Sequence, residues 1–187
     1  MKKINVLGVG AALVDQQFSI DDSLLKDLAL IKGSMDLKEQ ETQTQTYEKL
    51  VGLYGASQDA CGGSSTNTIY AAAILGSKCS FIGKVADDKN GRFYVENLNK
   101  ANIKNKCMSS DKGVSGNCLV MVSPDAERTM STFLGISSEL KVSDLDEEMI
   151  KEAEIVYLDA YLVTSDDNFD ATKRTLKIAK KNRTKIA

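Results

Sequence analysis

The 187-residue sequence contains no histidine, no tryptophan and a single proline. The absence of histidine excludes Ser-His-Asp and Cys-His catalysis, so any proton transfer must use a carboxylate, Lys, Tyr or Cys. The four cysteines, at positions 61, 79, 107 and 118, form no Cys-x-x-Cys pair. Without such a pair or any histidine, we expect no metal site in this chain. Cysteines with such irregular spacing suit a reducing cytoplasm.

The sequence also lacks an excess of charge and any long apolar run. Its 24 Lys and Arg oppose 26 Asp and Glu, which gives a net charge of −2. This balance argues against a nucleic-acid partner, which would need a basic face, and the basic run 173–185 fits a solvated helix face. No segment approaches the roughly 20 consecutive apolar residues of a membrane span. The sequence therefore predicts a cytoplasmic protein with neither a membrane nor a nucleic-acid partner.

Apolar runs typical of buried strands alternate with patterns typical of helices. The predicted core strands are Ile4–Val9, Ser80–Val85 and Ile155–Leu158. The predicted helices are 24–31 (stopped by Gly33), 47–53 (closed by Gly52 or Gly55), one from about 67 that ends at Gly76, 92–101, a short helix capped by Ser143-Asp144, and 166–181. Strand and helix in alternation predict an α/β fold with a parallel sheet.

A second set of patterns predicts a small β element. Residues 16–20 alternate in polarity, and the segments 114–122 and 128–133 are joined by the turn 123–127. At the end of the chain, Thr184–Ala187 has the pattern of a further strand directly after a helix. We therefore expect this sequence to be the front portion of a longer protein.

Two glycines follow the first predicted strand, in Gly8-Val9-Gly10. A dinucleotide-binding fingerprint would need Gly or Ala at position 13 and a helix that opens there, but position 13 is Leu13. The alternative is that both glycines let the backbone pass close to a ligand or to the next element. Asp15 stands just beyond, where α/β proteins bind ligands, although a turn residue would also fit there.

The glycine-rich segment 62–67 runs into a predicted helix. Its turn exposes backbone amides, while its hydroxyl and amide side chains can hydrogen-bond to a polyol or a phosphate. It lacks the lysine of a P-loop, so a sugar or a ribose suits it better than a nucleoside triphosphate. A capped connection without a ligand is the alternative.

In order along the whole chain, these segments resemble the PfkB (ribokinase-like) family of carbohydrate kinases, and within it the adenosine-kinase-like bacterial branch. The resemblance is carried by Asp15, Gly62-Gly63 with Asn67 and Gly76, Gly83–Asp88 with Gly91, Lys32–Met35, Pro124–Met130, Phe133–Gly135 and Tyr157–Leu162. The sequence departs from the family pattern at Ser65, Ile69 and Ala86, and at Asp159, where Glu is common.

The resemblance implies a ribokinase-like three-layer α/β/α fold with a parallel central sheet and a small β-sheet lid. The 187 residues would form the N-terminal portion of one kinase domain, with lid segments at about 15–20 and 110–135 and the C-terminal part of the fold absent. By position, the substrate-binding residues would be Asp15, Gly62, Gly63, Ser64, Asn67 and Asp159. Phe18, Cys118 and Phe133 would belong to the lid, with packing inside it as the favoured role of each.

Family members use ATP and Mg²⁺ to phosphorylate the hydroxymethyl group of a sugar or nucleoside, and their lids often pair two subunits into a homodimer. The family's Gly-Ala-Gly-Asp motif with the catalytic aspartate, its Asn-x-x-Glu magnesium motif and its adenine site lie in the C-terminal half, and none occurs here. We therefore expect the catalytic aspartate beyond Ala187, and a chain that alone is inactive and binds ATP and Mg²⁺ poorly. The alternatives are a truncated, non-catalytic sugar or nucleoside binder and a nucleotide-dependent oxidoreductase.

Overall fold

The computed structural model describes residues 2–187, apart from the side chains of residues 108 and 109, and it contains two five-stranded sheets. The first sheet is entirely parallel. Its strands, in spatial order, are β10 (Lys185–Ile186), β9 (Ala153–Leu158), β1 (Ile4–Val9), β5 (Cys79–Ala86) and β6 (Lys104–Ser110). The predicted α/β class with a parallel central sheet is confirmed.

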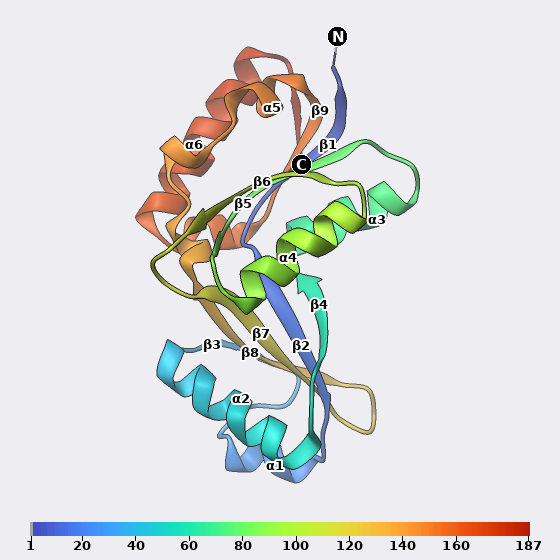
Figure 1. The fold of residues 1–187 in the computed structure, drawn as a ribbon, viewed down its shortest axis with the longest axis vertical. Helices are drawn as coiled ribbons and strands as arrows, with labels where there is room; N and C mark the ends of the chain where they lie inside the picture. Colours follow the sequence, from blue (N-terminus) through green and yellow to red (C-terminus); the bar gives the residue numbers. More distant parts are fainter. Residues whose placement is uncertain (1) are drawn as a thin grey trace.

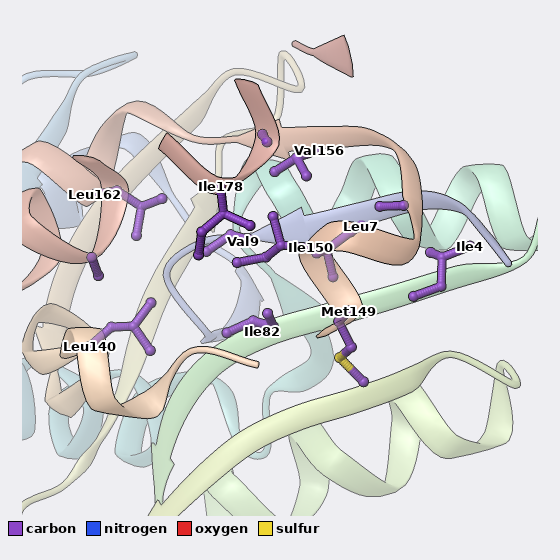
Figure 2. Close-up of a cluster of buried hydrophobic side chains, with 13 residues drawn as sticks. Ile4, Leu7, Val9, Ile82, Leu140, Met149, Ile150, Val156, Leu162 and Ile178 are labelled. Carbon is purple, nitrogen blue, oxygen red and sulfur yellow. The ribbon is translucent and has the colours of Figure 1, made fainter. Parts of the chain in front are cut away.

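Helices cover both faces of this sheet (Figure 1). On one face, Leu7 and Val9 of β1 pack against Ile150 and Ile178, which come from α5 (Glu147–Glu152) and α6 (Asp166–Lys181) (Figure 2). On the other face, α3 (Ser64–Ile74) and α4 (Lys89–Lys100) bury their apolar residues against Phe81 and its neighbours. Successive side chains of a strand point to opposite faces of the sheet, and here both faces are covered by apolar layers. The core strands are therefore apolar almost throughout.

The second sheet is the expected small β element, here called the lid. Its strands, in spatial order, are β3 (Met35–Leu37), β8 (Arg128–Gly135), β7 (Ser115–Val122), β2 (Leu13–Ser19) and β4 (Gln58–Gly62). Two helices, α1 (Asp22–Asp27) and α2 (Gln40–Tyr54), pack on one of its faces around Phe18, Leu50 and Leu119. They lie at the end of the molecule opposite α5 (Figure 1).

Several predicted boundaries are wrong. The helix predicted over 24–31 ends at Asp27, and Ala29 then adopts a left-handed φ of 51°. The helix predicted over 47–53 begins at Gln40, so the polar run before it is the first half of α2. The Ser143-Asp144 cap belongs to a 3₁₀ turn, whereas Asp146 caps α5 by accepting a hydrogen bond from the Met149 amide at 3.1 Å.

Further differences concern the start of α4 and three strands. The helix predicted over 92–101 begins at Lys89, because Asp88 caps it through the Gly91 amide at 2.8 Å. Strands β3, β4 and β6 are not among the predicted elements. Their sequences carry polar residues and no long apolar run, so their neighbours in the sheets, not their own patterns, determine them. Within residues 2–187, no helix combines the length and apolar character that a bilayer crossing requires.

The core makes a direct prediction about stability. Leu7 is 0% exposed in the centre of the parallel sheet, whereas Leu75 is 87% exposed after the end of α3. We expect Leu7→Ala to lower the free energy of unfolding by about 3 kcal/mol, because it leaves a cavity. The same change at Leu75 should cost less than about 0.5 kcal/mol. Chemical denaturation of both variants measures this, and equal losses would contradict the assigned core.

Candidate functional site

The site predicted from the sequence lies where the parallel sheet meets the lid. The chain leaves β1 at Val9 and enters β2 at Leu13 without an intervening helix. Asp15 therefore lies inside a strand, in register with Ala60 of β4 and Cys118 of β7, and the turn interpretation of this residue is wrong. The absence of a helix after Gly10 also removes the dinucleotide-binding interpretation, which requires one at this point.

The three predicted lid residues lie on different faces of the lid sheet. Cys118 lies in register with Asp15 on a parallel strand, so both side chains point to the same face, and Thr132 Oγ1 donates a hydrogen bond to Cys118 Sγ at 3.2 Å. Phe18 points to the opposite face, where its ring packs edge-on against Tyr47 with centroids 6.1 Å apart. Phe133 is in register with Asn117 and so lies on that opposite face too. Of the three, Cys118 alone shares a face with Asp15.

Asp15 is a half-buried carboxylate in close contact with Gly62. A Cβ atom added at Gly62 would overlap the Asp15 carboxylate, so glycine makes room for this side chain. Burial raises the pKa of Asp15, and the positive charge of Arg128 on β8 partly opposes the increase. Arg128 has no predicted role in the local sequence, because only the pairing of β8 with β7 brings it near Asp15.

The neighbouring thiols do not supply a nucleophile. Burial raises the pKa of Cys61 to about 12 and that of Cys118 to about 11, and in both cases the Asp15 charge adds to the increase. Thiols with such pKa values remain protonated at neutral pH. Among the described residues, no group of three or more His, Cys, Asp or Glu is placed to hold a metal ion.

Gly63 shapes the entry into α3. Its φ is 92°, and a Cβ atom at this position would lie 2.5 Å from the carbonyl oxygen of Ala11. The helix starts at Ser64, and its first turn carries Asn67. The backbone amide of Asn67 donates to the Gly63 carbonyl at 2.9 Å. Ser64 and Asn67 are exposed. The structure thus brings Asp15, Gly62 and Gly63 together beside the start of this helix.

The side chain of Asn67 also borders a separate cavity of about 380 Å³ between β4, α3 and α4, where Asp59, Tyr70 and Asn97 are among its neighbours. Asp15 does not line that cavity. The predicted partnership of Asp15 and Asn67 on one ligand therefore stays a prediction.

Asp159 follows β9 and is 6% exposed. Its Oδ2 accepts a hydrogen bond from the Ala11 amide at 3.2 Å, and its Oδ1 has no partner among the described residues. Burial raises its pKa, while nearby backbone amides, that of Ala11 foremost, oppose the increase. A Cβ atom at Gly10 would overlap this carboxylate. Asp159 thus ties the β1–β2 connection to the end of β9.

Gly62 and Gly63 are required for different structural reasons, which mutagenesis can distinguish. Gly63→Ala places a side chain in the left-handed region and against a backbone carbonyl, so it should cost about 2–4 kcal/mol of stability. Gly62→Ala requires only that the Asp15 side chain rotate away, and it should cost less than about 1 kcal/mol. Thermal and chemical unfolding of both variants measure the difference, and a larger loss for Gly62→Ala would contradict the geometry.

The raised pKa of Asp15 implies a pH-dependent cost to folding. The folded state binds the proton more readily than the unfolded chain, so the ionised form destabilises the fold at a pH above the folded-state pKa. Asp15→Asn should therefore increase the free energy of unfolding at pH 7. The gain should shrink as the pH falls and vanish below about pH 4, near the unfolded pKa. Denaturation at several pH values tests this, and a gain that grows toward acid pH would contradict it.

Comparisons with known proteins identify the family of this chain. Residues 29–187 match the family described as pfkB family carbohydrate kinase. A 5-dehydro-2-deoxygluconokinase of Clostridium perfringens is 32% identical over 129 residues, which cover 67% of this chain and 38% of the relative. A guanosine-inosine kinase of Escherichia coli is 24% identical over 184 residues, which cover 94% of this chain and 42% of the relative.

Two solved structures are similar over nearly the whole chain. The adenosine kinase from Sinorhizobium meliloti matches with a TM-score of 0.91 at 29% identity, over 98% of this chain and 55% of that protein. A probable sugar kinase from Rhizobium etli gives 0.92 at 27% identity, over 100% and 56%. The chain spans about half the length of these proteins, or less. The family match covers most of the chain and the predicted ribokinase-like fold is confirmed, so this chain belongs to the pfkB family of carbohydrate kinases.

Proposed function

We propose that this chain supplies the substrate-binding site and lid of an ATP-dependent kinase that phosphorylates the hydroxymethyl group of a sugar or nucleoside. The placement of Asp15 is the observation that supports this most directly. Its half-buried carboxylate lies at the junction of the parallel sheet and the lid, and Gly62 leaves room beside it. A carboxylate accepts hydrogen bonds from two neighbouring hydroxyl groups, which is the pattern that a sugar diol offers.

The start of α3 would complete the substrate site. In this proposal the backbone of Gly62 and Gly63, the hydroxyl of Ser64 and the amide of Asn67 contact the same sugar as Asp15. An amide side chain both donates and accepts, so it complements a carboxylate on a polyol. The exposure of Ser64 and Asn67 leaves their polar groups available to a ligand.

For Asp159, the geometry favours a positioning role. Its carboxylate is buried and accepts a hydrogen bond from Ala11, four residues before Asp15. We propose that Asp159 acts mainly by holding the β1–β2 connection in place. A contact between the sugar and this residue, as the family position implies, would need its Oδ1, which is buried and has no partner among the described residues.

The lid would close over the substrate and exclude water from the transferring phosphoryl group. Cys118, on the face of Asp15, would then border the substrate, while Phe18 holds the lid together from its other face. We include in the proposal that two copies pair through the lid, in which β3 and β4 are edge strands.

We propose that ATP and Mg²⁺ bind poorly to this chain alone. The described residues contain no group of three or more His, Cys, Asp or Glu placed to hold a metal ion, and the turn before α3 lacks a lysine. No step of phosphoryl transfer is therefore assigned to this chain, and Asp15 binds and orients the substrate. We propose that turnover requires a catalytic aspartate outside residues 1–187, in which case the chain alone binds its substrate without phosphorylating it.

Calorimetric titration of the 187-residue chain with inosine, adenosine, ribose and 5-dehydro-2-deoxygluconate tests the binding role. At least one ligand should bind, and Asp15→Asn should weaken it about 10- to 100-fold, because hydrogen bonds to a charged acceptor are lost. Asp27→Asn, an exposed change at the end of α1, is the matched control and should leave affinity unchanged. Binding that tolerates Asp15→Asn would contradict the assignment.

The second candidate function is a non-catalytic sugar or nucleoside binder, because the family's catalytic motif is missing from this sequence. Kinetics of the complete enzyme distinguish a kinase from such a binder. We expect Asp15→Ala to reduce kcat/KM at least about 100-fold, or roughly 3 kcal/mol. Near wild-type kinetics would contradict the role of Asp15. Phosphorylation by the 187-residue chain itself would contradict the claim that the base lies elsewhere.

A further inference from the structure

A second polar cavity lies on the face of the lid opposite Asp15. It has a volume of about 240 Å³ and is bounded by α2, by β2 and β7 of the lid sheet, and by the first turn of α4. Gln16 lines it from β2. Since Asp15 and Gln16 are consecutive residues of one strand, they point to opposite faces of the lid. The cavity is therefore distinct from the proposed sugar site.

A hydrogen-bonded network fixes the polar wall of this cavity. Gln43 Nε2 donates to Asn117 Oδ1 at 3.1 Å and to the Ser131 carbonyl at 2.9 Å, while Ser131 Oγ donates to Gln43 Oε1 at 2.7 Å. Asn117 Nδ2 in turn donates to Gln16 Oε1 at 2.8 Å. Each of these bonds uses a defined end of an amide, so the network determines which way Gln16 faces.

The network leaves the side-chain nitrogen of Gln16, Nε2, without a hydrogen-bond partner among the residues that the structure describes. Gln16 is 4% exposed as a whole. This nitrogen is not fully buried, so it can donate to water or to a ligand. Because Gln16 lines the cavity, its Nε2 is a donor that the cavity offers to a ligand.

The opposite wall of the cavity is the positive end of α4. Lys89 is the only charged residue that lines the cavity, and within residues 2–187 it forms no ion pair. The amides of Lys89 and Asn90 open the helix and have no acceptor among the described residues. The carboxylate of the helix cap, Asp88, is occupied, because it accepts from the Gly91 amide and from the Ser115 amide, both at 2.8 Å.

We propose that this cavity binds a small organic anion. Its anionic group would lie against Lys89 and the first amides of α4, where both the side-chain charge and the helix dipole favour negative charge. Gln16 would donate to the same group, and Tyr47 and Phe133, which also line the cavity, would contact an apolar part of the ligand. No carboxylate lines the cavity to oppose this. An occupant would bridge the lid and α4 of the core.

The proposal does not depend on the kinase assignment, and the 187-residue chain suffices to test it. Benzoate, phenyl phosphate, inorganic phosphate and the neutral analogue benzyl alcohol are titrated into ¹⁵N-labelled protein while amide shifts are recorded. Benzoate or phenyl phosphate should bind and move the backbone amides of Lys89 and Asn90 and the side-chain amide of Gln16. Benzyl alcohol should not bind. The preference between benzoate and phenyl phosphate, with inorganic phosphate as the bare anion, identifies the head group.

Two substitutions at opposite ends of α4 provide the matched pair. Lys89→Gln removes the charge at the cavity and should weaken binding at least about 10-fold. Lys100→Gln removes an exposed charge from the last turn and should change affinity less than about twofold. Both residues are exposed, so neither change is expected to unfold the protein. Equal affinities of the two variants would overturn the proposal. So would shifts confined to other residues, or no binding of either aromatic anion at about 10 mM.

Discussion

The site depends on a close approach between the backbone that leaves β1 and the elements on either side of it. A Cβ atom at Gly8 would lie 2.7 Å from Ser65 Oγ, one at Gly10 would overlap the Asp159 carboxylate, and one at Gly63 would meet the Ala11 carbonyl. Glycine at these positions lets α3 pack directly on β1 and lets Asp159 bond to the Ala11 amide. The connection held in this way delivers β2, and with it Asp15, to the junction of the two sheets.

The alternation of side chains along β2 then gives the lid two different faces. Asp15 and Cys118 lie on the face assigned to the sugar, whereas Phe18 and the amide of Gln16 lie on the face covered by α2. An apolar cluster holds α1 and α2 against the lid, and the Gln43 network fixes the register of the polar part beside it. The same strand therefore serves two environments, and a register shift of one residue would exchange them.

Much of this arrangement could be predicted from local sequence. The apolar runs Ile4–Val9 and Ile155–Leu158 identified core strands, and the amphipathic pattern of 166–181 matched α6 at both ends, because burial on a regular element leaves a periodic trace. Asp15 and the Gly62-Gly63 pair were singled out by their place after a strand and before a helix. Strands β3 and β4 could not be recognised, since their pairing partners lie far away in sequence. The closeness of Arg128 to Asp15, the burial of Asp159 and the cavity beside Gln16 have the same origin. Each depends on contacts between segments that lie 101 to 148 residues apart, for which the local sequence carries no pattern.

The central claim is that Asp15, at the junction of the two sheets, is where the substrate is held. A crystal structure of the 187-residue chain with bound inosine tests this most directly. The account predicts ribose hydroxyl groups within hydrogen-bond distance of the Asp15 carboxylate, beside Gly62 and Gly63 and the first turn of α3. Inosine bound instead in the cavity between Tyr70 and Asn97, with Asp15 free of the ligand, would contradict it.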